Sequence, residues 1–195
     1  MRTVTYLQIR NTAADLAGRP RDRLPDGEIQ VLRAFFASEL ADIWTREAWP
    51  ELCDHLESVT LASKMFSLRE GAADEMGDIL AIIEGGDPRT TTAVSKVAGW
   101  TRLDNRVNVV TNYASVYVDW QTPVTNLMAT TYDTEATLNA LTLPQRFHLP
   151  LAARGAALLL AEEDVIRAAA LRTFADVELA KQAVKITNRP WWRQL

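Results

Sequence analysis

The chain has 195 residues, of which 48% are hydrophobic and 24% are charged, and its formal net charge at pH 7 is -4. This composition is typical of a globular protein that buries one sizeable core or two small ones, and the negative charge argues against general affinity for nucleic-acid phosphates. No apolar run approaches the roughly 20 residues of a membrane span, no secretion signal is recognisable, and the single Cys53 fits a reducing compartment such as the cytoplasm.

Two helices are predicted in the first part of the chain. The first runs from about Thr5 to Ala17, and Gly18 is placed to end it. After a polar, proline-broken loop, Asp26 can cap a second helix. Apolar residues at three- and four-residue spacing define its buried face: Ile29, Leu32, Phe36, Leu40 and Ile43. We also expect core packing for the aromatic residues Phe35, Phe36, Trp44 and Trp49.

The middle of the chain changes to the pattern of short strands. Residues 58–68, 78–84, 106–112 and 115–120 are rich in β-branched and aromatic side chains and are separated by turn-like segments. They predict a small antiparallel β-unit. In "SVYVDW" the alternation predicts a buried face with Val116, Val118 and Trp120, and a wetter face with Tyr117 and Asp119. The threonine-rich residues 121–142 suggest a long excursion with one helical turn.

The helical period returns near the end. Pro144 fits the first turn of a helix. Its apolar face is formed by Phe147, Leu151, Ala152, Ala156, Leu159 and Leu160. "AEEDVIR" predicts a break, after which a long helix runs from near Glu163 to about Lys185. Its apolar positions are Ile166, Leu171, Phe174 and Leu179.

These elements predict an α+β fold that is mainly α with a β insertion. We expect N-terminal bundle helices in residues 1–56, the β-rich insertion in 57–142, C-terminal bundle helices in 143–187, and an extended C-terminal arm in 188–195.

The sequence contains little that indicates catalysis. It has no phosphate-binding glycine loop, no paired cysteines and no metal-ligand spacing, so we expect no enzyme activity, cofactor or metal. Cys53 and His55 stand close together, but a pair two residues apart on a helix points in divergent directions, which favours a structural cysteine. The carboxylates of "AEED" are better explained as helix caps than as an acid–base pair. The basic residues Arg19, Arg21 and Arg23 alternate with acidic ones, which favours a solvated or intersubunit loop.

The end of the chain, "ITNRPWWRQL", predicts a docking arm. Pro190 opposes a continued helix, and tryptophan and arginine are enriched in interface hot spots. We therefore expect a partner to bind Pro190, Trp191, Trp192, Arg193 and Leu195. The alternative is that the tail folds back and Trp191 plugs the chain's own bundle.

The layout as a whole resembles one protein family. A helical pair reaching "EAWPEL", a β-insert with "DILAIIEGGDP", then "VYVDWQTPV" and "LPQRFHLPLAARGAALLL", is similar to the head-to-tail adaptor (connector or head-completion) proteins of tailed bacteriophages. The similarity is one of organisation over most of the chain, strongest from about Val116 to Ala183, and includes no invariant fingerprint.

The resemblance implies a non-enzymatic virion protein, assembled in the host cytoplasm and located in the neck between head and tail. It implies a ring, typically of twelve copies, that binds the portal protein and the next neck or tail protein and lets DNA pass without sequence-specific binding. Trp191 and Trp192 would anchor the arm in the portal, and Arg193 would pair with a portal carboxylate or stack on an aromatic ring. A neck stopper or tail-completion protein, an assembly chaperone or binding module, and an enzyme using Cys53, His55 or His148 remain alternatives.

Overall fold

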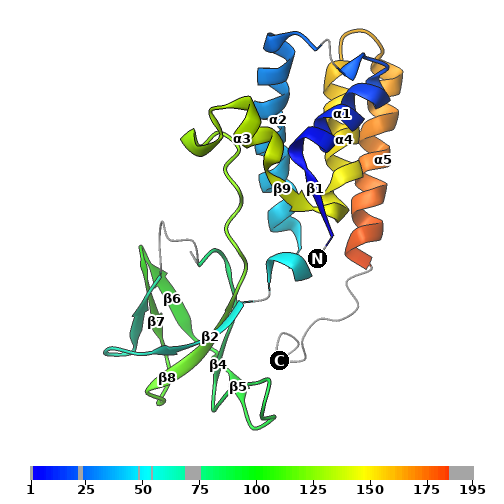
Figure 1. Ribbon diagram of the computed structural model, residues 1–195. Coiled ribbons are helices and arrows are strands. Elements are labelled where there is room, and N and C mark those ends of the chain that lie inside the picture. Colours follow the sequence, from blue (N-terminus) through cyan, green and yellow to red (C-terminus); the bar gives the residue numbers. More distant parts are fainter. Residues whose placement is uncertain (1, 22–23, 48, 54, 69–75, 185–195) are drawn as a thin grey trace. The chain divides into compact units, whose positions relative to one another are not determined.

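The computed structural model describes residues 2–21, 24–47, 49–53, 55–68 and 76–184. The chain divides into two compact units. Unit 1 contains Met1–Glu47 and Thr125–Lys185, and it holds the longer helices, whereas unit 2 contains Ala48–Val124 and holds most of the strands (Figure 1). The predicted α+β class is confirmed.

Local sequence signals set the ends of α1 (Tyr6–Ala17). The Thr5 hydroxyl accepts the Gln8 N–H at 3.2 Å, and the Gln8 side chain accepts the Thr5 N–H at 2.9 Å, which forms a capping box. Gly18 ends the helix in the left-handed conformation at φ 74°, where a side chain would be strained. Both predicted ends are confirmed.

The start of α2 (Asp26–Arg46) differs from the prediction. Asp26 is the first helical residue and not its cap; Pro25 holds the cap position and makes no side-chain hydrogen bond there. Proline at that position has the extended backbone that a cap needs, so the carboxylates of Asp26 and Glu28 fall in the first turn, where they oppose the helix dipole.

The prediction that Pro144 opens a helix is wrong. Pro144 ends the short strand β9 (Thr142–Pro144), which pairs antiparallel with β1 (Thr3–Thr5) (Figure 1). A one-turn helix η4 (Gln145–Phe147) follows, and α4 (His148–Leu159) starts only after it. The N–H of Gln145 donates to the Arg2 carbonyl at 3.0 Å, so pairing with a distant segment overrides the local helix signal.

Most of the segment predicted as a threonine-rich excursion of the insertion, residues 125–142, belongs to unit 1 with the helices. It contains the single turn η3 (Thr130–Tyr132) and the short helix α3 (Glu135–Ala140), which contacts α1. The Arg33 Nε of α2 also donates to the Leu127 carbonyl at 2.8 Å. Hydrogen bonds and packing to α1 and α2 therefore hold this segment against the bundle.

Helix α4 is the centre of unit 1, since α1, α2 and α5 (Val165–Val184) all contact it. It packs closely because it presents small side chains. Gly155 faces the ring of Phe36 and the methyl group of Ala13. The neighbouring alanines form a buried cluster with residues from α1, α5 and the end of α4: Ala17, Ala156, Ala157, Leu160 and Ala168.

Unit 2 is built from two antiparallel sheets. The order in the first is β2 (His55–Thr60), β8 (Ser115–Trp120), β4 (Ile79–Glu84) and β5 (Ser95–Lys96); in the second it is β3 (Met65–Ser67), β7 (Arg106–Val109) and β6 (Trp100–Leu103). Val116, Val118 and Trp120 join the core as predicted. The prediction that Asp119 faces water is wrong: it is 1% exposed, because β8 is a central strand flanked by β2 and β4.

The buried face of α5 also differs from the prediction. Ala168, Ala175 and Leu179 are its buried residues, whereas Ile166 is 85% exposed and Phe174 is 43% exposed. Leu179 and the partly buried Leu171 face the core as predicted, together with Ala168 and Ala175, whereas the prediction is wrong for Ile166 and Phe174. Trp44 and Trp49 are buried as expected, and Phe35 is half-buried.

Candidate functional site

The predicted docking arm lies outside the described residues. Its residues are Pro190, Trp191, Trp192, Arg193 and Leu195. Arg23 of the predicted basic cluster lies outside them as well. The docking role of the arm therefore stays a prediction.

The three residues considered for catalysis lie in different elements of the chain. Cys53 is a buried thiol at the end of a single helical turn, η2 (Pro50–Leu52), in unit 2, whereas His148 begins α4 in unit 1. His55 starts strand β2, and its side chain lies outside the described part of the structure. The assumption that Cys53 and His55 share a helix is wrong, because the chain is extended from His55 onward.

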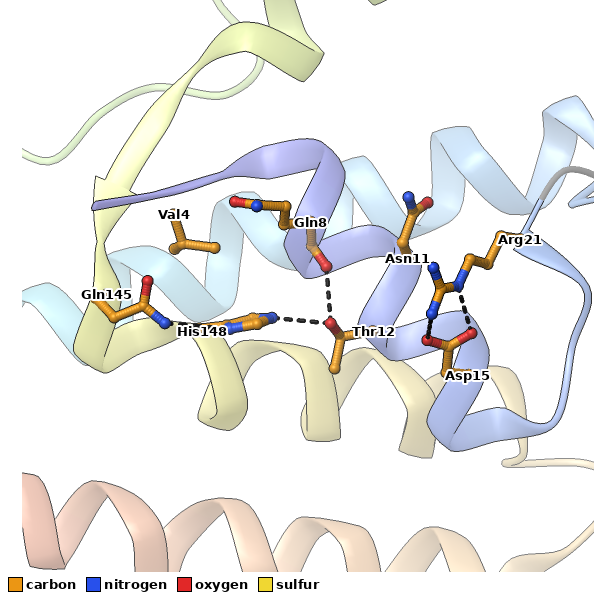
Figure 2. A pocket seen from close by; sticks show the side chains of 8 residues that line it. All are labelled: Val4, Gln8, Asn11, Thr12, Asp15, Arg21, Gln145 and His148. Carbon is orange, nitrogen blue, oxygen red and sulfur yellow. Dashed lines mark hydrogen bonds and ion pairs between the residues drawn. The ribbon is translucent and has the colours of Figure 1, made fainter. Parts of the chain in front are cut away.

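His148 lines a polar cavity of about 220 Å³ in unit 1 (Figure 2). Residues of α1 form one wall, and the loop before α4 and the start of α4 form the other. The lining residues are Val4, Gln8, Asn11, Thr12, Asp15, Arg21, Gln145 and His148. The cavity brings together segments that lie far apart in the sequence, so no local motif could have predicted it.

A continuous set of hydrogen bonds fixes the imidazole. The Thr12 hydroxyl donates to the Gln8 carbonyl at 2.9 Å, and its oxygen lies 2.8 Å from His148 Nε2, which must then donate. His148 Nδ1 is consequently the acceptor for the Gln145 side-chain amide at 3.4 Å. Burial lowers the pKa of His148 by disfavouring the charged form, and this outweighs a raising contribution from the Gln8 backbone.

This arrangement positions the helices better than it positions a nucleophile. The Thr12 proton points to a backbone carbonyl, so the imidazole does not act as its base. Asp15, the carboxylate of the cavity, is held by Arg21 through two hydrogen bonds of 2.7 and 2.5 Å, and these lower its pKa. The geometry therefore ties α1 to the start of α4.

A buried arginine that the sequence analysis did not single out connects three helices. Arg154 of α4 is 8% exposed and binds Glu39 and Asp42 of α2 and Asp176 of α5. Burial disfavours its charge, but the hydrogen bonds that Arg154 donates to Asp176, Asp42 and Glu39 outweigh this cost and raise its pKa. Burial likewise opposes ionisation of Asp42, yet hydrogen bonds from Arg46 and Arg154 leave its pKa lowered.

The charged residues between α4 and α5 and those after α1 are also paired within unit 1. Asp164 caps α5 by accepting the Arg167 N–H at 2.9 Å, as predicted for "AEED". Glu163 binds Arg19 at 2.6 Å, and Arg19 lies 3.7 Å from Glu28. Two of the three carboxylates of "AEED", Glu163 and Asp164, therefore act as an ion-pairing and a capping group.

Both units expose large apolar side chains. In unit 1 they concentrate on α5, where Ile166, Phe174, Val177 and Val184 are exposed. In unit 2 they lie on β6 and after β7: Trp100, Leu103, Val110 and Tyr113. Exposed apolar side chains indicate a surface that binds another molecule where they form a contiguous patch, whereas single ones are common on protein surfaces.

Comparisons with known proteins name no relative. No known protein family matches the chain, and a search of curated proteins gives no match. Among the described residues, no group of histidine, cysteine and carboxylate side chains is arranged to hold a metal ion, and no described helix is long and apolar enough to cross a membrane.

Proposed function

We propose that the chain is a non-enzymatic virion structural protein, a head-to-tail adaptor of a tailed bacteriophage. It forms a ring beneath the portal, extends the DNA channel and provides the attachment site for the tail. The arm around Trp191 and Trp192 docks into the portal, and the β-rich part contacts the next neck component or lines the channel.

One observation carries the proposal: both structural units expose large apolar side chains. Ile166 and Val184 of α5 are 85% and 79% exposed, and Val110 in unit 2 is 71% exposed. A protein that works between two partners and beside copies of itself needs several such surfaces. At the cavity beside His148, in contrast, the polar groups Thr12, Gln8 and His148 are hydrogen-bonded to one another and hold α1 against α4. The organisational resemblance described above is the reason for choosing an adaptor among the proteins that bind several partners.

The net charge agrees with a channel protein. At -4, the chain repels the phosphate backbone, so DNA slides past it without being held. Each contact between neighbouring copies can be weak. A closed ring docked on a portal makes many such contacts at once, so the assembly as a whole is stable.

Truncation of the arm tests the proposal. Deleting Pro190–Leu195 should leave a folded protein and filled heads that do not join tails, because the ring loses its anchor in the portal. Trp191→Ala with Trp192→Ala should reproduce the defect, and Gln194→Ala is the matched control that should not. Normal yields of tailed particles from the truncated protein would contradict the docking role.

The position of the protein in the particle separates the remaining alternatives. An adaptor is present in purified virions in the copy number of a ring and lies next to the portal. An assembly chaperone or transient binding module is absent from finished virions, and a stopper or tail-completion protein lies farther from the portal. Quantitative mass spectrometry and labelling of the neck distinguish these outcomes.

A further inference from the structure

Three buried polar atoms of α1 and α2 make no hydrogen bond to any residue that the structure describes. They are the Tyr6 hydroxyl and Arg10 Nε, both on α1, and Arg33 Nη2 on α2. Tyr6 is 1% exposed, and each of the two arginines is 8% exposed. A buried polar group without a hydrogen bond destabilises the folded state, so these atoms indicate a partner that the described chain does not supply.

Helix geometry brings the three atoms together. Residues three or four apart lie on one face of a helix, so Arg10 lies beside Tyr6 on α1, and Arg33 lies beside Phe36 on α2. The rings of Tyr6 and Phe36 pack edge to face at 5.9 Å, which places the two pairs against each other. Burial raises the pKa of Tyr6 to about 12, whereas the positive charges of Arg10 and Arg33 act to lower it. Both guanidinium groups therefore lie close to the Tyr6 hydroxyl.

The charges around this cluster do not balance. Arg10 Nη1 binds the Glu135 carboxylate of α3 at 2.9 Å, which compensates the charge of Arg10. Arg33 Nε donates to the neutral Leu127 carbonyl, and within the described ranges no carboxylate forms an ion pair with Arg33. With its raised pKa, Tyr6 stays protonated near pH 7 and supplies no negative charge. One buried positive charge is left, and a single negative charge would compensate it.

We propose that Tyr6, Arg10 and Arg33 bind a small monovalent anion of the size of chloride. The Tyr6 hydroxyl, Arg10 Nε and Arg33 Nη2 are all hydrogen-bond donors, so an anion can accept from the three and also compensate Arg33. A water molecule carries no charge and would leave Arg33 uncompensated. Bound between α1 and α2, the anion stabilises unit 1. This role goes beyond the adaptor function proposed above and does not depend on it.

Urea denaturation of the full chain measures the stabilisation, because urea itself adds no anion. Sodium chloride replaces sodium gluconate at constant ionic strength, so that the bulky gluconate serves as the reference anion. For a dissociation constant of about 10 mM, about 100 mM chloride should raise the folding equilibrium constant about tenfold. Broadening of the chloride NMR signal by the folded chain measures the binding directly.

Two variants test the residues assigned to the site. Tyr6→Phe removes the hydroxyl but keeps the ring that packs on Phe36, so it should weaken chloride binding about tenfold or more, as expected for the loss of one hydrogen bond to a charged group. Arg33→Met removes the charge and keeps the apolar bulk, so it should abolish the dependence of stability on chloride. Arg172→Met is the matched control: Arg172 is exposed on α5 and lies outside the cluster, so this variant should retain the full dependence.

Three results would overturn the proposal. Wild-type stability that does not change with chloride would show that water or another part of the chain satisfies these atoms. An equal dependence on chloride in the wild type, Tyr6→Phe and Arg33→Met would show a general effect of salt. Broadening of the chloride signal that persists undiminished in Arg33→Met would show that chloride binds elsewhere on the chain.

Discussion

Replacing Gly155 with alanine tests the packing of the helical unit most sharply. A methyl group built at Gly155 meets the Phe36 ring carbons Cζ and Cε1 at 2.6 and 2.7 Å, whereas carbon atoms in contact lie about 3.5–4.0 Å apart. The ring would have to move by about 1 Å. It has little room to do so, since Phe36 is 1% exposed and its ring packs edge-on against Tyr6 at 5.9 Å.

The expected cost follows from two opposing contributions. Overpacking of a well-filled core costs typically 1–3 kcal/mol, and the shift of about 1 Å places Gly155→Ala near the upper end, at about 3 kcal/mol. Alanine regains about 1 kcal/mol of helix propensity relative to glycine. We therefore expect the free energy of unfolding to fall by about 2 kcal/mol.

Chemical denaturation followed by circular dichroism measures this difference, and Gly27→Ala provides the control. Gly27 lies near the start of α2, and a methyl group there has no atom within 4 Å. That variant should keep or raise the free energy of unfolding by up to about 1 kcal/mol. If both variants were equally stable, the packing of α4 against Phe36 would be wrong.

Two further predictions concern the polar contacts of unit 1. Arg154→Met should lower the free energy of unfolding by about 2–3 kcal/mol, less than the 3–5 kcal/mol of a fully buried pair because Asp42 and Asp176 are half exposed or more. Arg172→Met is the control, because Arg172 lines the same surface pocket as Arg154, Glu39, Asp42 and Asp176; equal effects of the two variants would refute the role of Arg154. Burial lowers the pKa of His148 in the folded chain below 6.5, its value in the unfolded chain. The contribution of His148 to the free energy of unfolding is therefore complete above pH 6.5 and is lost as the pH falls through the pKa of the folded chain. His148→Gln should therefore reduce the loss of unfolding free energy between pH 7.5 and pH 5, as measured by chemical denaturation at the two pH values. An equal loss in the variant and the wild type would show that protonation of His148 does not cause it.

Elements with strong local signals were predictable from the sequence. The ends of α1 depend on Thr5, Gln8 and Gly18, all within the helix or next to it, and the strand "SVYVDW" has the expected buried residues. Asp164 caps α5 because a carboxylate before a helix can satisfy its free N–H groups. In these cases the interactions that decide the structure are made between neighbours in the chain.

Elements that depend on distant partners were not predictable. Pro144 ends a strand because β1 is available to pair with it. Helix α5 buries Ala168, Ala175 and Leu179 because that face fits the small side chains of α4. The contacts of Arg154 join residues far apart in the sequence. The same holds for the cavity beside His148, whose walls come from segments far apart in the sequence.

The proposed adaptor function depends on docking of the C-terminal arm on a portal. The most direct test places a photo-crosslinking residue at Trp192 in the cell that produces the protein and identifies the captured protein by mass spectrometry. If the arm docks as proposed, the crosslinker at position 192 should capture a portal subunit. Crosslinks formed only within the same chain, in assembled particles, would contradict it and would mean that the tail covers its own bundle.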